Sequence, residues 1–163
     1  MIKTFIITTL FLLQISVANS QSTSTGIDLI ITINGEVIVG DIMNVKISST
    51  SETKMQEIIN CGYYPGKLSV PESGFESIPD SSEVNLSFDF YGDSLGGRKL
   101  SNFRIKLMKR WLKSSYLILH VFDLNDKKYK RIFEPISKDQ NYTFSITSPD
   151  YSFIRVTKKK IKQ

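Results

Sequence analysis

The sequence has few of the residues that build disulfide-linked or metal-binding proteins: it contains one cysteine, Cys61, one histidine, His120, and one tryptophan. A single cysteine cannot form an internal disulfide, so the chain is not a cysteine-stapled scaffold. Zinc sites usually need three or four His, Cys or acidic ligands, and His and Cys together supply only two. We interpret Cys61 as a small buried hydrophobic residue, with a bridge between two chains as the alternative.

The sequence offers little support for the short motifs that carry catalysis. Gly92-Asp93-Ser94-Leu95-Gly96 matches the letters of G-x-S-x-G, but it falls in a predicted loop between two strands and not at the strand-to-helix turn of a nucleophile elbow. No glycine-rich phosphate loop occurs. His120 lies inside an apolar run, which favours a hydrogen-bonded core or edge histidine over a catalytic one. Hydrolysis by a pair of acidic residues stays open as an alternative, because a chain with sixteen acidic residues can always bring some two of them together. We predict a protein that is not an enzyme and that uses neither a cofactor nor a metal.

No apolar run in the sequence reaches the roughly 20 residues that a membrane span needs. The nine residues Phe5–Leu13 follow Lys3 and precede the small residues Ala18-Asn19-Ser20. This arrangement is typical of a cleaved signal peptide over residues 1–20. We expect a secreted, extracellular protein without a transmembrane segment, whose mature chain of 143 residues begins at Gln21.

Positive and negative charges are unequally distributed along the chain. Residues 21–93 contain three lysines and eleven acidic residues, a net charge of −8. Residues 94–163 contain seventeen basic and five acidic residues, a net charge of +12. Such asymmetry bears on partners and solubility rather than on fold.

The most apolar segment of the mature chain is Tyr116–Phe122, in which every residue except His120 is apolar. Apolar residues at odd and even positions alike indicate a strand whose two faces are both covered. We therefore predict a central strand, with a buried helix as the alternative. Leu124–Lys127 would then turn the chain, and Tyr129–Phe133 would return as a basic partner strand.

Other segments indicate further strands. Asn34-Gly35 between two apolar runs is a strong hairpin signal, because both turn residues must accept a positive φ. Elsewhere, short segments alternate apolar and polar residues or are rich in strand-forming types. These segments are Met43–Ser48, Val84–Phe90, Phe103–Leu107, Tyr142–Ile146 and Tyr151–Val156.

One short helix is predicted between these strands. Ser49–Glu52 fits an S-x-x-E capping box, Met55, Ile58 and Ile59 would form an apolar stripe, and Gly62 could end the helix. Residues 63–79 carry three of the five prolines and predict an irregular crossing with room for one short strand. The fold class is therefore mostly β, an antiparallel β-sandwich of about seven to nine short strands with one short helix. We expect a single domain over residues 21–157, followed by a basic tail over residues 158–163.

Three segments between Gly66 and Ile146 resemble, in order and spacing, the transthyretin-like secreted proteins of nematodes. They are Asn102–Ile105, Tyr116–His120 and Arg131–Ile136. The sequence departs from that family at Ser114-Ser115, where Asp-Pro is usual, and in lacking a cysteine after the histidine. The resemblance implies a transthyretin-like or immunoglobulin-like sandwich without the activity of the related urate-pathway hydrolases. It also implies an alternative function, carriage of a small apolar ligand inside the sandwich or at a dimer interface.

Cations of the C-terminal half are the candidate binding residues. If the strand over residues 103–107 and the return strand over residues 129–133 are neighbours, up to nine cations share one surface. The nine are Arg104, Lys106, Lys109, Arg110, Lys113, Lys127, Lys128, Lys130 and Arg131. Ordinary solvation of an outer sheet face is the alternative reading. The binding hypothesis is an anionic extracellular surface, a polysaccharide or another protein, with no nucleic acid expected and homodimerisation left open.

Two glycosylation sequons occur in the mature chain, Asn85-Leu86-Ser87 and Asn141-Tyr142-Thr143. The alternation of each strand places the asparagine and the hydroxyl residue on its polar face. Asn85 and Asn141 are therefore candidate glycan acceptors, with chance occurrence of the triplets as the alternative.

Overall fold

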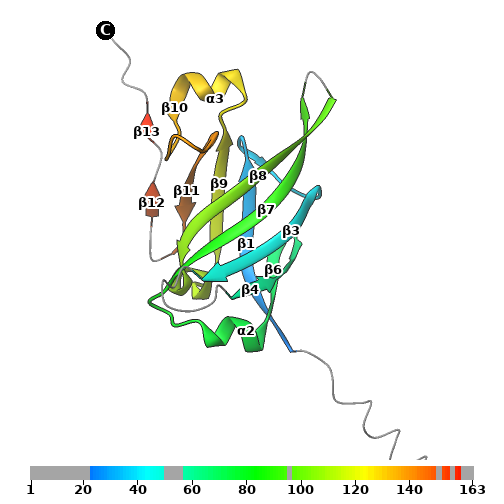
Figure 1. Ribbon diagram of the computed structural model, residues 1–163, viewed down its shortest axis with the longest axis vertical. Coiled ribbons are helices and arrows are strands. Elements are labelled where there is room, and N and C mark those ends of the chain that lie inside the picture. Colours follow the sequence, from blue (N-terminus) through cyan, green and yellow to red (C-terminus); the bar gives the residue numbers. More distant parts are fainter. Residues whose placement is uncertain (1–22, 50–56, 95–96, 150–151, 155–156, 159–163) are drawn as a thin grey trace, which may run out of the picture.

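The computed structural model describes residues 23–49, 57–94, 97–149, 152–154 and 157–158. It is mostly β, with two main sheets packed as the layers of a sandwich, and the strands of the front sheet cross those of the rear sheet diagonally (Figure 1). The predicted signal peptide and residues 159–163 of the predicted tail lie outside the described residues. Within the described part of the chain, no helix is long and apolar enough to cross a membrane.

The larger sheet has seven strands. Its path runs through β12 (Ser152–Ile154), β11 (Tyr142–Thr147), β9 (Leu117–Asp123), β1 (Ser24–Ile33), β6 (Gly66–Pro71) and β5 (Gly62–Tyr64), and β2 (Glu36–Val37) pairs with β1. β9 lies between β11 and β1 and buries Leu117, Leu119 and Val121. The predicted central strand is thus confirmed, but its second face, which carries Ile118, His120 and Phe122, is only partly covered.

β9 and β1 pair in parallel, with Thr32 opposite His120. The prediction of a purely antiparallel sandwich was therefore wrong, and the larger sheet is mixed. The physical reason lies in the connection: only strands joined by a short hairpin must run antiparallel. The chain between β1 and β9 passes through the whole of the second sheet, so it can re-enter in either direction.

The second sheet has four strands in the order β4 (Ile58–Asn60), β3 (Ile42–Ser49), β7 (Glu83–Ser94) and β8 (Gly97–Met108). Its alternating residues divide as predicted: Leu86, Phe88 and Ile105 are buried in the core, while the residues between them face outward. Aromatic rings link the two sheets. Phe88 and Phe103 have ring centroids 5.4 Å apart, and Phe103 meets the edge of Tyr142 on β11 at 5.2 Å.

The predicted return strand over residues 129–133 is instead a helix, α3 (Lys127–Ile132), followed by the short β10 (Phe133–Glu134). The Asp126 carboxylate caps the helix by accepting from the Lys128 N–H at 2.8 Å. Tyr129 and Phe133 are four residues apart, and both rings pack on Phe122, at centroid distances of 5.6 and 4.6 Å. Their spacing fits the period of a strand as well as that of a helix, so the pattern alone could not separate the two.

The prediction of a helix that ends at Gly62 was wrong for the residues that the structure describes. Residues 58–60 form β4, which pairs with β3, and Gly62 begins β5. The capping box over residues 49–52 and Met55 lie mostly outside the described residues, which resume at Glu57. Residues 63–79 are more regular than predicted, because they contain most of β5, all of β6 and the helix α2 (Glu72–Ser77), whose Phe75 is buried.

The turn predicted at Asn34-Gly35 is confirmed. Asn34 and Gly35 have φ values of 56° and 88° and join β1 to β2. Residues 109–113, where the alternation of β8 breaks, form the 3-10 helix η1 (Lys109–Lys113).

Candidate functional site

The nine cations predicted to share one surface lie in three places. Arg104 and Lys106 are on the outer face of β8, Lys109, Arg110 and Lys113 are in η1, and Lys127, Lys128, Lys130 and Arg131 are in α3. α3 lies at one end of the sandwich, whereas η1 contacts the chain that follows α2 at the other end (Figure 1). The single nine-cation surface is therefore not formed, because the α3 segment is not a strand beside β8.

The η1 group is engaged in structural contacts. Lys109 is only 1% exposed, and its ammonium donates to the Ile78 carbonyl at 2.5 Å and lies 3.4 Å from the Asp80 carboxylate. The same ammonium lies 4.6 Å from the centroid of the Phe75 ring. Lys113 pairs with Asp80 at 2.9 Å, and this bond holds the pKa of the Asp80 carboxyl below its usual value. Lys109 cannot contact a partner from this position, which corrects the prediction for that residue.

The β8 group is smaller than expected. Lys106 forms an ion pair with Glu83 at 2.6 Å. One of the two cations of the β8 group is therefore already neutralised. Arg104 is exposed on the outer face, in register with Ser87 of β7. It has no ion pair with a described residue.

The four cations of α3 are all exposed, and the contacts that hold the helix leave them free. Tyr129 faces the sheet, packs on Phe122 and donates its hydroxyl to the backbone carbonyl of Asn34. The cations occupy four of the other five positions of this short helix, and Ile132 occupies the fifth. Lys128 lies over the Tyr129 ring with its ammonium 5.1 Å from the centroid, and no carboxylate of the described residues forms an ion pair with Lys127, Lys130 or Arg131.

The end of the chain adds to this group. β10, which directly follows α3, pairs with β13 (Thr157–Lys158), so that Phe133 is opposite Lys158. Three of the five residues after Lys158 are lysines in the sequence. We call the set Lys127, Lys128, Lys130 and Arg131 the basic pole, and the strand pairing places the backbone of Lys158 directly beyond it. The sequence did not predict that the end of the chain lies beside α3, because this proximity depends on the pairing of two strands of two residues each.

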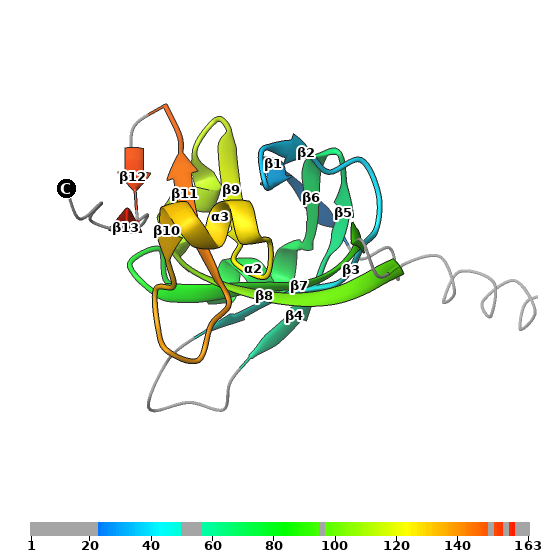
Figure 2. The ribbon, with the colours of Figure 1, turned by 90° about the horizontal axis from the view of Figure 1, so that it is seen from above.

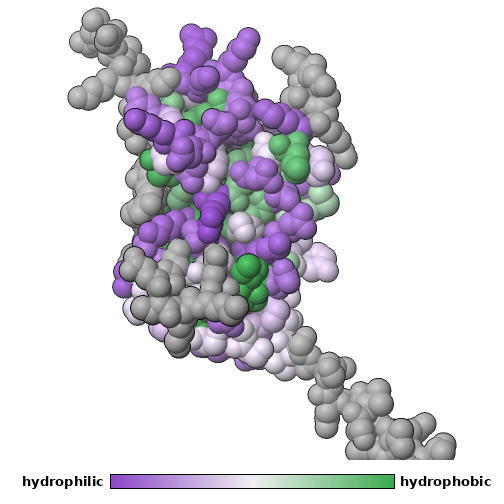
Figure 3. Space-filling model, in the orientation of Figure 1, coloured by the Kyte–Doolittle hydropathy of each residue, from purple (hydrophilic) through white to green (hydrophobic). Residues whose placement is uncertain are grey.

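The basic pole lies at a hydrophilic end of the molecule. Figure 3, in the orientation of Figure 1, shows hydrophilic side chains gathered where α3 lies. Ile132 is an apolar residue among them and is 43% exposed. The pole is therefore an exposed, hydrophilic surface suited to a charged partner rather than to an apolar one.

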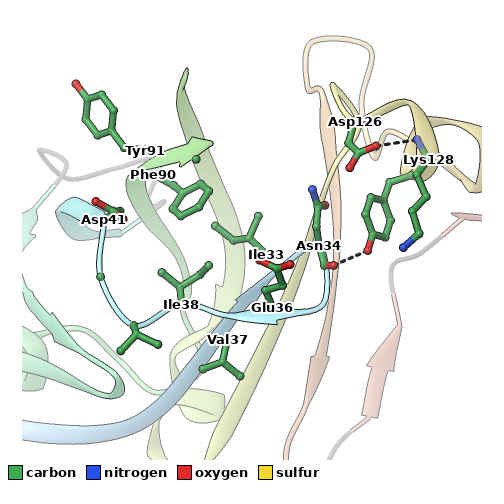
Figure 4. A pocket seen from close by; sticks show the side chains of 14 residues that line it. Ile33, Asn34, Glu36, Val37, Ile38, Asp41, Phe90, Tyr91, Asp126 and Lys128 are labelled. Carbon is green, nitrogen blue, oxygen red and sulfur yellow. Dashed lines mark hydrogen bonds between the residues drawn. The ribbon is translucent and has the colours of Figure 1, made fainter. Parts of the chain in front are cut away.

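A depression of about 530 Å³ borders the pole between α3, the β1–β2 turn and the start of β3. Figure 4 shows Asp126 and Lys128 on one side of it and Asp41 on the other, with Glu36 near the middle. Its lining thus carries three carboxylates against one ammonium. An anionic partner would be repelled there, which limits its contact to the sides of α3 that face away from the depression.

The two sequons differ in accessibility. Asn141 is exposed at the start of β11. Asn85 lies on the outer face of β7, as predicted, but it is only 7% exposed. It sits between Ser48 and Lys106 of the neighbouring strands, where the folded sheet leaves no room for a glycan. In the folded state, Asn141 is the more accessible acceptor.

The residues considered for chemistry have structural partners. The Nδ1 atom of His120 lies 2.9 Å from the Thr32 hydroxyl on the paired strand, and burial lowers the pKa of this histidine. Cys61 is a half-buried free thiol whose pKa burial raises to about 11. Among the described residues, no group of three or more His, Cys, Asp or Glu is placed to hold a metal ion.

Comparison with protein-family models, curated proteins and solved structures gives no match to this chain.

Proposed function

We propose that this protein is a secreted, non-enzymatic interaction protein that binds an anionic extracellular partner through its basic pole. The observation that carries the proposal is the cluster of four exposed cations on α3 that form no ion pair with a described carboxylate, with the backbone of Lys158 brought beside the helix by the pairing of β10 with β13. Clustered cations that lack carboxylate partners raise the local concentration of anions and steer their approach. A sulfated polysaccharide fits this surface well, because the four cations are exposed and a chain of sulfate groups can contact them without entering a cleft.

The transthyretin-like form of the sandwich and the carriage of an apolar ligand stay predictions from the sequence resemblance. Three cavities among the described residues are open at the surface and lined in part by charged side chains, which favours polar ligands over apolar ones. The basic pole is therefore the better-supported site.

Chromatography on heparin tests the proposal. A pole variant changes Lys127, Lys128, Lys130 and Arg131 to Gln, a residue that preserves helix propensity. A control variant removes the same number of charges from other faces, at Lys67, Lys99, Lys106 and Lys113. Three of these control lysines already pair with carboxylates, at 3.0 Å for Lys67, 2.6 Å for Lys106 and 2.9 Å for Lys113.

We expect the wild type and the control variant to elute well above physiological salt, about 0.15 M, and the pole variant to elute near or below it. Deletion of residues 159–163 should lower the elution salt further toward that of the pole variant. Wild-type elution at or below ~0.15 M salt would refute the proposal. Equal elution of the pole and control variants would show that net charge, not the pole, is responsible.

Secretion is tested separately. Sequencing of the N-terminus of protein recovered from culture medium should begin at Gln21. A secreted chain that retains Lys3 would contradict the cleavage site.

A further inference from the structure

The outer face of the four-stranded sheet carries a second polar site, away from the basic pole. Residues 135–141, which connect β10 to β11, run past the edge of β8 to the outer side of this sheet (Figure 2). Between this loop and strands β3, β7 and β8 lies a cavity of about 690 Å³, which we call the sheet groove. Its size falls within the range of small-molecule sites, about 300–1,000 Å³.

One row of residues across the sheet places a hydroxyl between two cations, one on each side. Lys46 of β3, Ser87 of β7 and Arg104 of β8 are direct neighbours in register, and all three line the groove. Adjacent strands are about 4.8 Å apart, so the backbones of Lys46 and Arg104 are about 10 Å apart. Both side chains are long enough to meet above Ser87. Neither cation forms an ion pair with a described residue.

The next row supplies groups that bind hydroxyls. Asp89 of β7 accepts hydrogen bonds from the side-chain amides of Asn44 at 2.7 Å and Asn102 at 2.5 Å. These bonds fix the two amides and leave their carbonyl oxygens as acceptors. Gln140 of the loop lines the same groove with a further amide.

The charges in the groove balance, which bears on the class of ligand. Lys46 and Arg104 are opposed by Asp89 and by Asp139 of the loop. A polyanion gains little from a neutral groove, whereas a ligand with one anionic group can place that group at the cations and its hydroxyls at the acceptors. This requirement describes a small polyhydroxylated molecule that carries one tetrahedral oxyanion.

We propose that the sheet groove binds a sulfate or phosphate monoester of a sugar. The ester oxyanion lies above Ser87 between Lys46 and Arg104, with the guanidinium donating two parallel hydrogen bonds. The sugar hydroxyls donate to the amide carbonyls of Asn44 and Asn102. The proposal for this site is independent of the basic pole, because the groove lies on the outer face of the four-stranded sheet and contains none of the pole's residues.

Titration of the ¹⁵N-labelled protein, followed by amide NMR signals, tests the proposal with three probes: glucose 6-sulfate, glucose 6-phosphate and glucose. We expect the esters to shift the signals of Ser87, Arg104 and Gln140 and to bind at least about tenfold more tightly than glucose. A preference for one ester identifies the source of the oxyanion.

Variants localise the effect. Changing Lys46 and Arg104 together to Gln should weaken ester binding by at least about tenfold, whereas Lys67→Gln with Lys106→Gln, which removes the same charge, should not. The amide spectrum of each variant shows whether it is folded, and the milder Lys46→Arg should keep binding if the double variant fails to fold. The pole variant described above should bind the esters like the wild type, so failure here and failure on heparin are distinguishable. The inference is overturned if glucose binds as tightly as the esters, if the shifts map to α3, or if the groove variant binds like the wild type.

Discussion

The hydroxyl of Tyr142 is bonded twice to the backbone of one residue of the opposite sheet: it accepts from the N–H of Arg104 at 2.8 Å and donates to its carbonyl at 2.5 Å. β8 is an edge strand, so these two backbone groups have no strand partner on that side. A single side chain thus satisfies a partly buried stretch of edge and ties the two sheets together where the groove begins. Burial of the phenol raises the pKa of Tyr142.

Tyr142→Phe should lower the free energy of unfolding by about 1–3 kcal/mol, because both backbone groups of Arg104 lose their partner in a partly buried position. Urea denaturation measures the change. Tyr64→Phe is the matched control, since Tyr64 is 69% exposed, and it should leave the stability unaltered. A Tyr142→Phe protein as stable as the control would mean that water replaces the hydroxyl at no cost.

Lys109→Met should destabilise the fold and leave heparin binding unchanged. The substitution keeps an unbranched side chain one atom shorter and removes the donor to the Ile78 carbonyl, a loss of about 1–3 kcal/mol for a buried hydrogen bond. Lys113→Met removes a partly exposed ion pair and should cost little stability. Elution of Lys109→Met well before the wild type would show that this ammonium reaches a partner after all.

Stability should fall as the pH drops from 7 toward 5, with a contribution from His120. Burial lowers the pKa of this histidine in the folded state, so the unfolded chain, with a value near 6.5, takes up the proton first. The stabilisation is therefore complete above about pH 6.5 and is lost as the pH falls toward the lower folded pKa.

The comparison protein for this measurement is His120→Gln, which cannot titrate and retains groups that can hydrogen-bond Thr32. Its unfolding free energy, measured by urea denaturation at each pH, should depend less on pH across that window than the wild-type value. Parallel profiles for the two proteins would assign the pH dependence to other groups.

The Cys61 thiol should react slowly in the folded protein. A pKa of about 11 in place of 9.0 reduces its thiolate fraction at pH 8 on the order of a hundredfold. Alkylation by iodoacetamide, followed by mass spectrometry, should accelerate strongly when the protein is unfolded in urea. Non-reducing electrophoresis should show a monomer, and a dimer abolished by Cys61→Ser would replace this account with a bridge between chains.

The strands could be predicted where one face meets the core and the other meets water. Val84, Leu86 and Phe88 alternate with polar residues, and burial follows that alternation closely. The prediction failed where short segments fit two periods. Tyr129 and Phe133 satisfy a helix and a strand equally, and only their contact with Phe122 decides between them.

The sequence could predict that cations form the candidate site, but not which of them lie together in the fold. The lysines of α3 were recognised as a cluster because they adjoin in sequence. Lys109 was misjudged, since its burial depends on Ile78 and Asp80, about thirty residues away. The row of Lys46, Ser87 and Arg104 depends on the register of three strands, which no local pattern specifies.

The parallel pairing of β1 with β9 has a consequence for the folding of the nascent chain during its synthesis on the ribosome. Thr32 and His120 touch across 88 residues of sequence. At about 5–20 residues per second, β1 leaves the ribosome on the order of ten seconds before β9 does. During that interval Ile30 and its apolar neighbours have one sheet edge open to other chains. The short β2 and the later β6 can shield only part of β1, so the nascent chain is most vulnerable to aggregation before its central strand is made.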